Sequence, residues 1–285
     1  MRSTLGPLGR ATGPPGAARA RPDGPVERPV ITQNGGSRLN PEYDALRDTV
    51  ATACRVLAHE GLVEGILGHV SARVDDGHLL VRCRGPEERG LHATRPDEIR
   101  LVDFDGQGDE LSGGWKVPSE LPIHAELYRA RPEVEAVVHA HPPAALLCGL
   151  AGLTPRPVFG AFNIPAMRLA LDGVPEYPRP VLITRAELAG EMIAAMGDHS
   201  VCLLVGHGIT TAGDSVEQAT VRAVNLNVLL AVTVALARLG ASPPDVSPED
   251  LAELPDLGSR FNNELVWRAL VDRAATGVPP GPRFF

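Results

Sequence analysis

The sequence predicts an α/β fold in which helices cover both faces of a central, mostly antiparallel sheet, an α/β/α sandwich. Short alternating or β-branched segments, separated by turn sequences, follow a first helical segment, and further segments with helical spacing come after them. With 285 residues, of which 44% are hydrophobic, the chain can bury a full core as one large domain. We therefore expect one folded domain over residues 39–285.

Residues 1–38 differ in composition from the rest of the chain. They are rich in Gly, Pro, Ala and Arg and have almost no aromatic or long aliphatic side chains. Such a segment cannot bury enough apolar surface to offset the entropy of ordering it. We expect a disordered tail here. It lacks the sustained apolar stretch of a secretory signal, and its Arg-rich, acid-poor composition leaves a transit peptide as the alternative.

The first elements of the domain have clear boundaries. A helix is expected to begin at Asn40-Pro41, an N-cap residue followed by proline, and to end at Gly61. Its apolar stripe consists of Leu46, Val50, Ala53, Cys54 and Leu57. Three strands separated by Asp-Asp-Gly, Arg-Gly-Pro and Asp-Gly-Gln turns should then form an antiparallel meander over residues 70–74, 78–82 and 99–104.

Helices and strands alternate in the second half. Helices are expected over residues 119–130, 143–150, 185–196, 215–239 and 261–274, and strands over residues 134–141, 181–184 and 201–206. Asp214 is expected to cap the long helix of residues 215–239. This helix is apolar on most of its faces, so it needs cover either from its own subunit or from a second one.

Composition excludes several classes of protein. The net charge is -8 and the only strongly basic stretch is the first forty residues, so nucleic-acid binding by the folded part is not expected. The longest apolar run, residues 228–237, is too short to span a membrane. No Cys-x-x-Cys pair occurs, and reduced thiols in a cytoplasmic protein are expected for Cys54, Cys83, Cys148 and Cys202.

Lysine is almost absent. Lys116, in a Gly-Gly-Trp-Lys turn, is the single lysine among 27 basic residues. An aldolase that works through a Schiff base needs a lysine shielded from solvent, so imine chemistry is not expected.

Three histidines form a candidate metal site. His139 and His141 lie two apart in an expected strand, so both side chains point to the same face. His207 follows an apolar strand and stands between two glycines. Three neutral imidazoles with an open fourth position are typical of a catalytic metal site rather than a closed structural one.

Glu120 and His124 lie four apart at the start of an expected helix, so their side chains face the same way. The pair can serve the chemistry of the site. The alternative is structural, with Ser119 as the helix cap and Glu120 as an acidic residue of the first turn.

Four ordered segments resemble the class II aldolase/adducin family over roughly residues 41–255. They are Gly68-His69-Val70-Ser71-Ala72-Arg73, then Pro118-Ser119-Glu120 with His124, then Arg131-Pro132 to His141, and then Gly206-His207-Gly208. The resemblance implies an α/β/α fold and usually a homotetramer with sites near subunit boundaries. It also implies that His139, His141 and His207 bind one divalent metal ion per subunit, with Glu120 as the acid/base.

The family's chemistry is cleavage of a carbon–carbon bond through a metal-stabilised enolate, for which Glu120 would move the proton. Zinc is the expected metal, and the three histidines leave manganese and iron open. Adducin-like members act as interaction modules and would be expected to lack the complete triad. The triad is complete here, so we expect an enzyme.

Departures from the family pattern indicate which chemical class of substrate to expect. The sugar-phosphate aldolases have Gly-Asn where this chain has Gly68-His69, a hydroxyl residue in place of Ile66, and a serine in place of Pro118. We therefore expect a small-molecule carboxylate, bound by His69, Ser71, Ser119 and His124 together with the guanidinium of Arg84. The alternative for Arg82 and Arg84 is that they are solvated turn residues.

Within the family, the sequence resembles the decarboxylases of hydroxy-carboxy-muconic semialdehydes and related aromatic-catabolic acids. The shared segments are Leu57-Ala58-His59-Glu60-Gly61, Gly68-His69-Val70-Ser71 and Arg156-Pro157-Val158-Phe159. We expect a metal-dependent lyase that decarboxylates a keto or enol carboxylic acid. The alternatives are a sugar-phosphate aldolase and an Fe(II) oxygenase similar to those acting on prenylated hydroxyphenylpyruvates. Residues that could line an apolar pocket or belong to the core are Phe159, Phe162, Ile164 and Met167.

Overall fold

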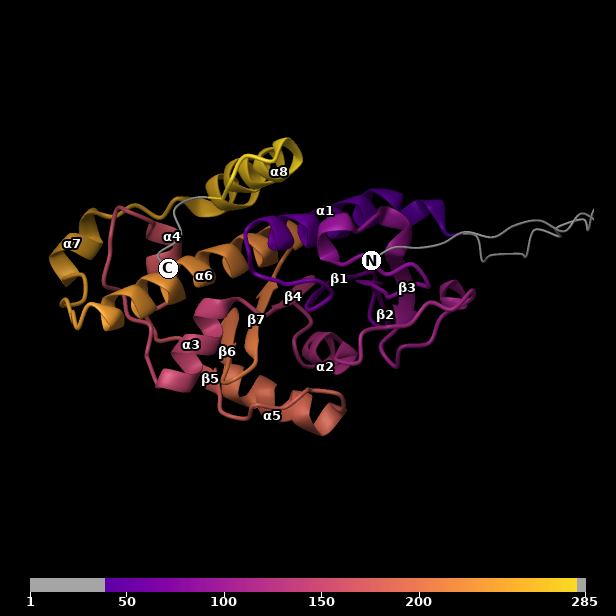
Figure 1. The fold of residues 1–285 in the computed structure, drawn as a ribbon, viewed down its shortest axis with the longest axis horizontal. Helices are drawn as coiled ribbons and strands as arrows, with labels where there is room; N and C mark the ends of the chain where they lie inside the picture. The colour runs from indigo at the N-terminus through magenta and orange to yellow at the C-terminus, as the bar shows by residue number, and fades with distance from the viewer. Residues whose placement is uncertain (1–38, 281–285) are drawn as a thin grey trace, which may run out of the picture. The chain divides into compact units, whose positions relative to one another are not determined.

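A seven-stranded sheet organises residues 39–280, the part of the chain that the computed structural model describes (Figure 1). Its strand order is β3-β2-β1-β4-β7-β6-β5, and every neighbouring pair is antiparallel except β5 and β6. The tail expected over residues 1–38 lies outside the described residues. The strands are β1 (His69–Arg73), β2 (His78–Arg82), β3 (Ile99–Asp103), β4 (Ala136–Ala140), β5 (Glu176–Tyr177), β6 (Val201–Leu204) and β7 (Gly208–Gly213).

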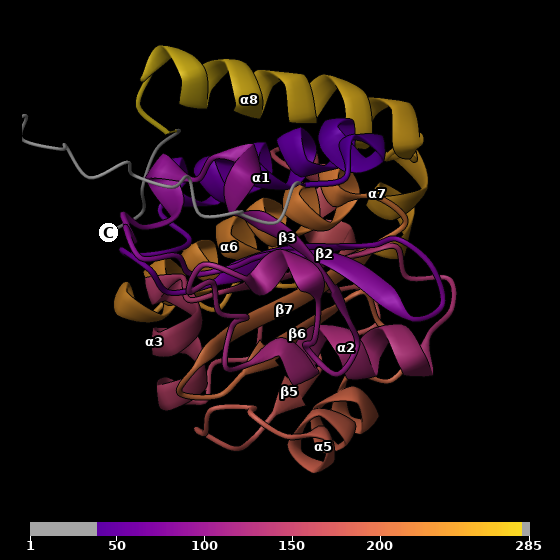
Figure 2. The ribbon, with the colours of Figure 1, turned by 90° about the vertical axis from the view of Figure 1, so that its right-hand side faces the viewer.

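Helices cover both faces of the sheet (Figure 2). Three helices, α1, α3 and α6, share one hydrophobic core with the sheet, α2 and α5 share a second core on the other face, and α8 packs outside α1 and α6. This arrangement confirms the expected α/β/α sandwich. The helices are α1 (Asp44–His59), α2 (Leu121–Ala130), α3 (Pro143–Ala151), α4 (Ile164–Arg168), α5 (Ala186–Met196), α6 (Val216–Arg238), α7 (Pro248–Glu253) and α8 (Trp267–Thr276).

Alternation along β4 decides where polar groups can gather. Val138 and Ala140 point into the core with α1, α3 and α6, whereas Val137 points into the core with α2 and α5. Since successive side chains alternate between the faces of a sheet, His139 lies on the α2 side with Val137. The functional residues of the sheet are therefore expected under α2.

The long helix α6 is covered by its own subunit. Of its residues, Ala237 and Arg238 alone are exposed. Its length and hydropathy would allow it to cross a membrane, but 56% of its most apolar window is buried inside the domain, as is usual for a core helix. The expected cap was wrong by one residue, because Ser215 Oγ accepts the Gln218 N–H while Asp214 accepts from the Gln218 side chain.

Sequence predictions for the other helices and the meander were close. The Asn40 side chain accepts the Glu42 N–H at the start of a 3-10 turn, η1 (Pro41–Tyr43), which leads into α1. Antiparallel pairing of β1, β2 and β3 gives the expected meander. The last helix begins with a π-helical turn, η5 (Arg260–Val266), and the short helices α4 and α7 were not expected.

Two strand predictions were wrong. Residues 181–184 form no strand, because Pro178 and Pro180 interrupt the segment and the Ile183 N–H donates to the Glu120 carboxylate instead of to a neighbouring strand. The strand expected over residues 201–206 ends at Leu204 and turns back into β7, which was missed. The sequence of β7, Gly-Ile-Thr-Thr-Ala-Gly, has few long apolar side chains and is bounded by glycines.

Gly208 is required where β7 meets β4. A Cβ atom here would overlap the carbonyl oxygen of Ala140, and backbone cannot move aside without breaking the strand pairing. We predict that Gly208→Ala lowers the melting temperature and displaces the neighbouring His207, measured by thermal unfolding and metal binding.

Gly190 provides the matched control. It is exposed within α5 and has open space around it, so Gly190→Ala should leave stability unchanged or raise it by up to about 1 kcal/mol. Equal stability of the two variants would contradict the close packing of β7 on β4.

Candidate metal centre

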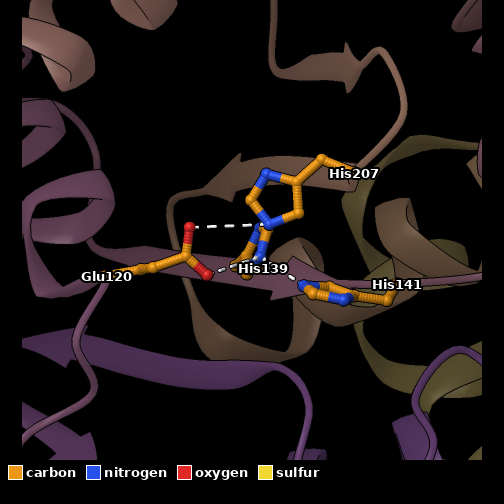
Figure 3. Close-up of side chains that lie close together, drawn as sticks. All are labelled: Glu120, His139, His141 and His207. Carbon is orange, nitrogen blue, oxygen red and sulfur yellow. Dashed lines mark hydrogen bonds and ion pairs between the residues drawn. The ribbon is translucent and has the colours of Figure 1, made fainter. Parts of the chain in front are cut away.

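Four ligand-bearing side chains converge at one end of the α2 face (Figure 3). His139 lies on β4 and His141 directly after it, His207 lies in the turn between β6 and β7, and Glu120 stands immediately before α2. Their ligand atoms all lie within 4.8 Å of one another. The three histidines singled out in the sequence are thus brought together with the one carboxylate expected beside them.

Hydrogen bonding fixes the tautomer of His139. Its Nδ1–H donates to the Ile209 carbonyl of β7 at 3.0 Å, so its Nε2 carries a lone pair. That Nε2 lies 2.8 Å from the Nε2 of His141. Two imidazole nitrogens thus point at the same small volume, an arrangement that a shared cation stabilises.

His207 supplies the test of whether a metal fits. Both of its ring nitrogens are buried and have no hydrogen-bond partner among the described residues, and its Nε2 is 3.5 Å from Glu120 Oε1, beyond a good hydrogen bond. Buried polar atoms rarely lack a partner in folded proteins. Three imidazoles, one of them with two unpartnered nitrogens, and a nearby carboxylate fit a divalent cation with an open position.

Burial keeps these imidazoles in the form that binds metal. Desolvation, reinforced by the neighbouring histidines, lowers the pKa of His139 well below its usual value. Burial and His207 lower the pKa of His141 to about 4. Both rings are therefore neutral near pH 7, and a neutral imidazole has the lone pair that a metal needs.

Glu120 is held by one oxygen and free at the other. Its Oε1 accepts the Ile183 N–H at 2.8 Å, while Oε2 lies 3.6 Å from His139 Nε2. Burial opposes ionisation, but His207, the Ile183 N–H and His141 outweigh it, so the pKa of Glu120 is lowered. The site therefore contains an ionised carboxylate that can accept a proton.

Behind the centre lies a buried chain of hydrogen bonds. His69 Nδ1 lies 2.6 Å from His124 Nε2, His124 Nδ1 lies 2.6 Å from Ser71 Oγ, and Ser71 Oγ lies 2.7 Å from the Tyr128 hydroxyl. His69 is paired with His139 across β1 and β4, with their rings 5.0 Å apart. Burial lowers the pKa of His124 to about 3, and burial with His124 lowers that of His69.

Tyr128 was missed in the sequence, although a signal for it existed. His124 and Tyr128 are four apart on α2, as His69 and Ser71 are two apart on β1, so each pair shares a face. Ser71 and His124 have no exposed surface. Ser71 and His124 therefore cannot contact a bound molecule directly, and they can influence one only through His69.

The remaining expected substrate residues lie in different surroundings. Arg84 is half-buried, and its side chain makes no hydrogen bond or ion pair with the described residues, whereas Arg82 is bonded to Glu88. Only Arg84 of the two thus has an uncommitted guanidinium. Ser119 and Lys116 are exposed, and Lys116 pairs with Arg84 through backbone atoms.

The aromatic segment considered for a pocket behaves mostly as core. Phe159 packs against the core that α6 covers, and Met167 is fully buried. Phe162 stacks edge-on against Phe159 and is 63% exposed. Ile164 begins α4, which packs on α6.

Comparison with known proteins gives concordant matches. A family model described as the class II aldolase and adducin N-terminal domain matches residues 48–234. A 3,4-dihydroxyphthalate decarboxylase of Arthrobacter keyseri is 53% identical over 225 residues, covering 78% of this chain and 91% of that protein. A protein of the same name from Terrabacter sp. (strain DBF63) is 50% identical over 234 residues, covering 81% and 98%. An aldolase II superfamily protein from Pseudomonas syringae, 23% identical, shares the fold with a TM-score of 0.67, covering 85% of this chain and 96% of that one.

We predict that His207→Ala lowers metal content well below one ion per subunit, because it removes one of the three imidazoles that converge on the site. The measurement is elemental analysis of protein stripped with a chelator, reloaded and desalted. His92→Ala, at an exposed histidine, is the control and should bind as the wild type does. Wild-type occupancy in His207→Ala would remove His207 from the site.

Proposed function

The chain belongs to the class II aldolase and adducin family, and from that premise we propose that its substrate is a dihydroxylated aromatic dicarboxylate of the 3,4-dihydroxyphthalate type. It is a lyase of the decarboxylating kind. The observation that carries the substrate proposal is the cluster of His139, His141, His207 and Glu120, in a chain about half identical to two 3,4-dihydroxyphthalate decarboxylases over nearly their whole lengths.

The chemistry of such a substrate suits this site. Two adjacent hydroxyl oxygens form a chelate of the kind that a metal with open positions accepts. A phenol is also an enol, so a dihydroxylated aromatic acid falls within the class of keto or enol carboxylic acids expected from the sequence. The bond to be broken joins the ring to a carboxylate beside one of the hydroxyls.

We assign His139, His141 and His207 as the residues that hold one divalent metal ion per subunit. When bound, such an ion supplies an electrophile that polarises the substrate's adjacent oxygens. Zinc is our choice among the metals that imidazole ligands suit, because decarboxylation requires no change of oxidation state.

Glu120 moves the proton in this proposal. Its Oε2 is free to accept the proton of the hydroxyl beside the departing carboxylate, while the Ile183 N–H holds Oε1 in place. The ring-to-carboxylate bond breaks, carbon dioxide leaves, and Glu120 returns the proton to the ring carbon. The resulting phenolate takes up a proton from solvent, which balances the reaction.

Arg84 is our candidate for attracting the dianionic substrate. Its guanidinium is half-buried and uncommitted among the described residues, and it lies close enough to contribute to the lowered pKa of His69. A guanidinium fork matches the geometry of a carboxylate. Ser119, exposed directly before Glu120, is the other residue that we place at the mouth of the site.

Neither alternative activity is favoured. The relatives that are about half identical carry a decarboxylase name, not that of an oxygenase or an aldolase. This chain also lacks the hydroxyl and amide groups with which the sugar-phosphate aldolases bind phosphate. Ile66, which is exposed, and Pro118, which is buried, replace hydroxyl residues. His69 replaces an asparagine, and its Nδ1 is hydrogen-bonded to His124.

We also propose that the enzyme is a cytoplasmic homotetramer. Apolar side chains near the site are exposed in the single subunit, on α3 after His141 and in the loop before β1: Leu146, Leu147, Leu150, Ile66 and Leu67. Contact with a second subunit would cover them. The four cysteines are buried free thiols, which suits a reducing compartment. Light scattering coupled to size-exclusion chromatography measures the oligomeric state, and a monomer would contradict the proposal.

Glu120→Gln should retain the metal and lose about 10²- to 10⁴-fold in turnover, because the amide keeps the bond to the Ile183 N–H but cannot carry a proton. Steady-state kinetics and metal analysis of the same preparation check both parts. Turnover close to that of the wild type would reject the role.

Oxygen dependence separates decarboxylation from oxygenation. Protein loaded separately with zinc, manganese or iron should release carbon dioxide from 3,4-dihydroxyphthalate equally in air and under nitrogen, without oxygen uptake. Turnover only with iron and only in air would contradict decarboxylation and would indicate an oxygenase. Cleavage of L-fuculose 1-phosphate by the same preparations would favour the aldolase.

A further inference from the structure

The hydrogen-bond chain Tyr128–Ser71–His124–His69 has a direction. Each neutral imidazole has one N–H and one lone pair, and each hydroxyl has one proton to donate. The chain can therefore run in one of two ways. Either Tyr128 is the first donor and His69 the last acceptor, or the reverse.

Tyr128 decides between the two directions. Its hydroxyl is buried, and among the described residues Ser71 Oγ is the only partner that can accept its proton, because the Val137 N–H that also interacts with it is a donor. If Ser71 donated to Tyr128, the phenolic proton would be left without an acceptor, and a buried donor without a partner is strongly unfavourable. Tyr128 must therefore donate to Ser71, Ser71 to His124 Nδ1, and His124 Nε2–H to His69 Nδ1.

This direction determines what His69 presents to the site. Its Nδ1 is an acceptor, so its Nε2 carries the proton and cannot bind a metal. That Nε2 has no hydrogen-bond partner among the described residues, and the His69 side chain is buried with 4% of its surface exposed. The ring lies beside His139, and the uncommitted guanidinium of Arg84 is close enough to help lower the pKa of His69.

We propose that His69 is a fixed hydrogen-bond donor that binds the substrate carboxylate that remains on the ring, and that Tyr128, Ser71 and His124 are positioning residues that hold its tautomer. The assignment of this carboxylate rests on the proposed function. A donor placed on the departing carboxylate would stabilise a charge that the reaction removes, and would slow it. A donor placed on the retained carboxylate stabilises a charge that persists throughout.

Neutron diffraction tests the tautomer without any turnover. Deuterium-exchanged crystals of the zinc-loaded protein should show deuterium on His69 Nε2 and none on Nδ1. Deuterium on Nδ1, or an Nε2 that binds zinc, would overturn the proposal.

Ligand binding tests the carboxylate subsite, also without turnover. In the zinc-loaded protein, His69→Leu should weaken binding of 3,4-dihydroxybenzoate by about 10- to 100-fold, the loss expected for one hydrogen bond to a charged group. Binding of catechol, which lacks the carboxylate, should change little. An equal loss for both compounds, or no loss for either, would contradict the assignment.

Two variants at His124 separate positioning from simple structural support. The glutamine amide of His124→Gln can still donate to His69 Nδ1, whereas His124→Leu cannot. His124→Gln should keep the preference for 3,4-dihydroxybenzoate over catechol, and His124→Leu should lose it about tenfold. The same preference in both variants would overturn the positioning role. If the wild type releases no carbon dioxide from 3,4-dihydroxyphthalate, the proposed function fails, while the diffraction and binding results still decide the donor assignment.

Discussion

Antiparallel pairing along both edges of β4 is the interaction on which the site depends. On one edge it places His139 opposite His69 of β1, and on the other it brings β7, the Ile209 carbonyl and the turn that carries His207 to the same end of the strand. The pairing also buries the rings, and burial keeps imidazole neutral. One register therefore supplies both the geometry and the protonation state that a metal centre needs.

The α2 face of the sheet serves two purposes. It holds a core of apolar side chains from α2 and α5, and it also holds Glu120, His124 and Tyr128 beside the polar residues of β1 and β4. Buried polar groups are tolerated there because most are bonded to each other. His207 is the exception, because neither of its ring nitrogens has a hydrogen-bond partner in the part of the chain that the structure describes, and this supports the proposal that it binds the metal.

Sequence reasoning succeeded where periodicity carries the information. Spacing by two on a strand placed His139 with His141, and turn residues delimited the meander. It failed where long-range contacts decide the structure: β7 is a strand because β4 and β6 supply partners for a weak segment, and residues 181–184 are irregular because Glu120 takes the Ile183 N–H. The link from Ser71 to Tyr128 joins residues 57 apart in the chain, and the spacing along α2 indicates only that Tyr128 shares a face with His124.

We propose that His139, His141 and His207 together hold one metal ion. Anomalous X-ray diffraction from crystals of zinc-loaded protein, with data on both sides of the zinc absorption edge, would locate that ion. We expect one strong peak per subunit at about 2 Å from the Nε2 atoms of the three histidines, with Glu120 beside the open position. A peak on other residues, or none at these three, would contradict it.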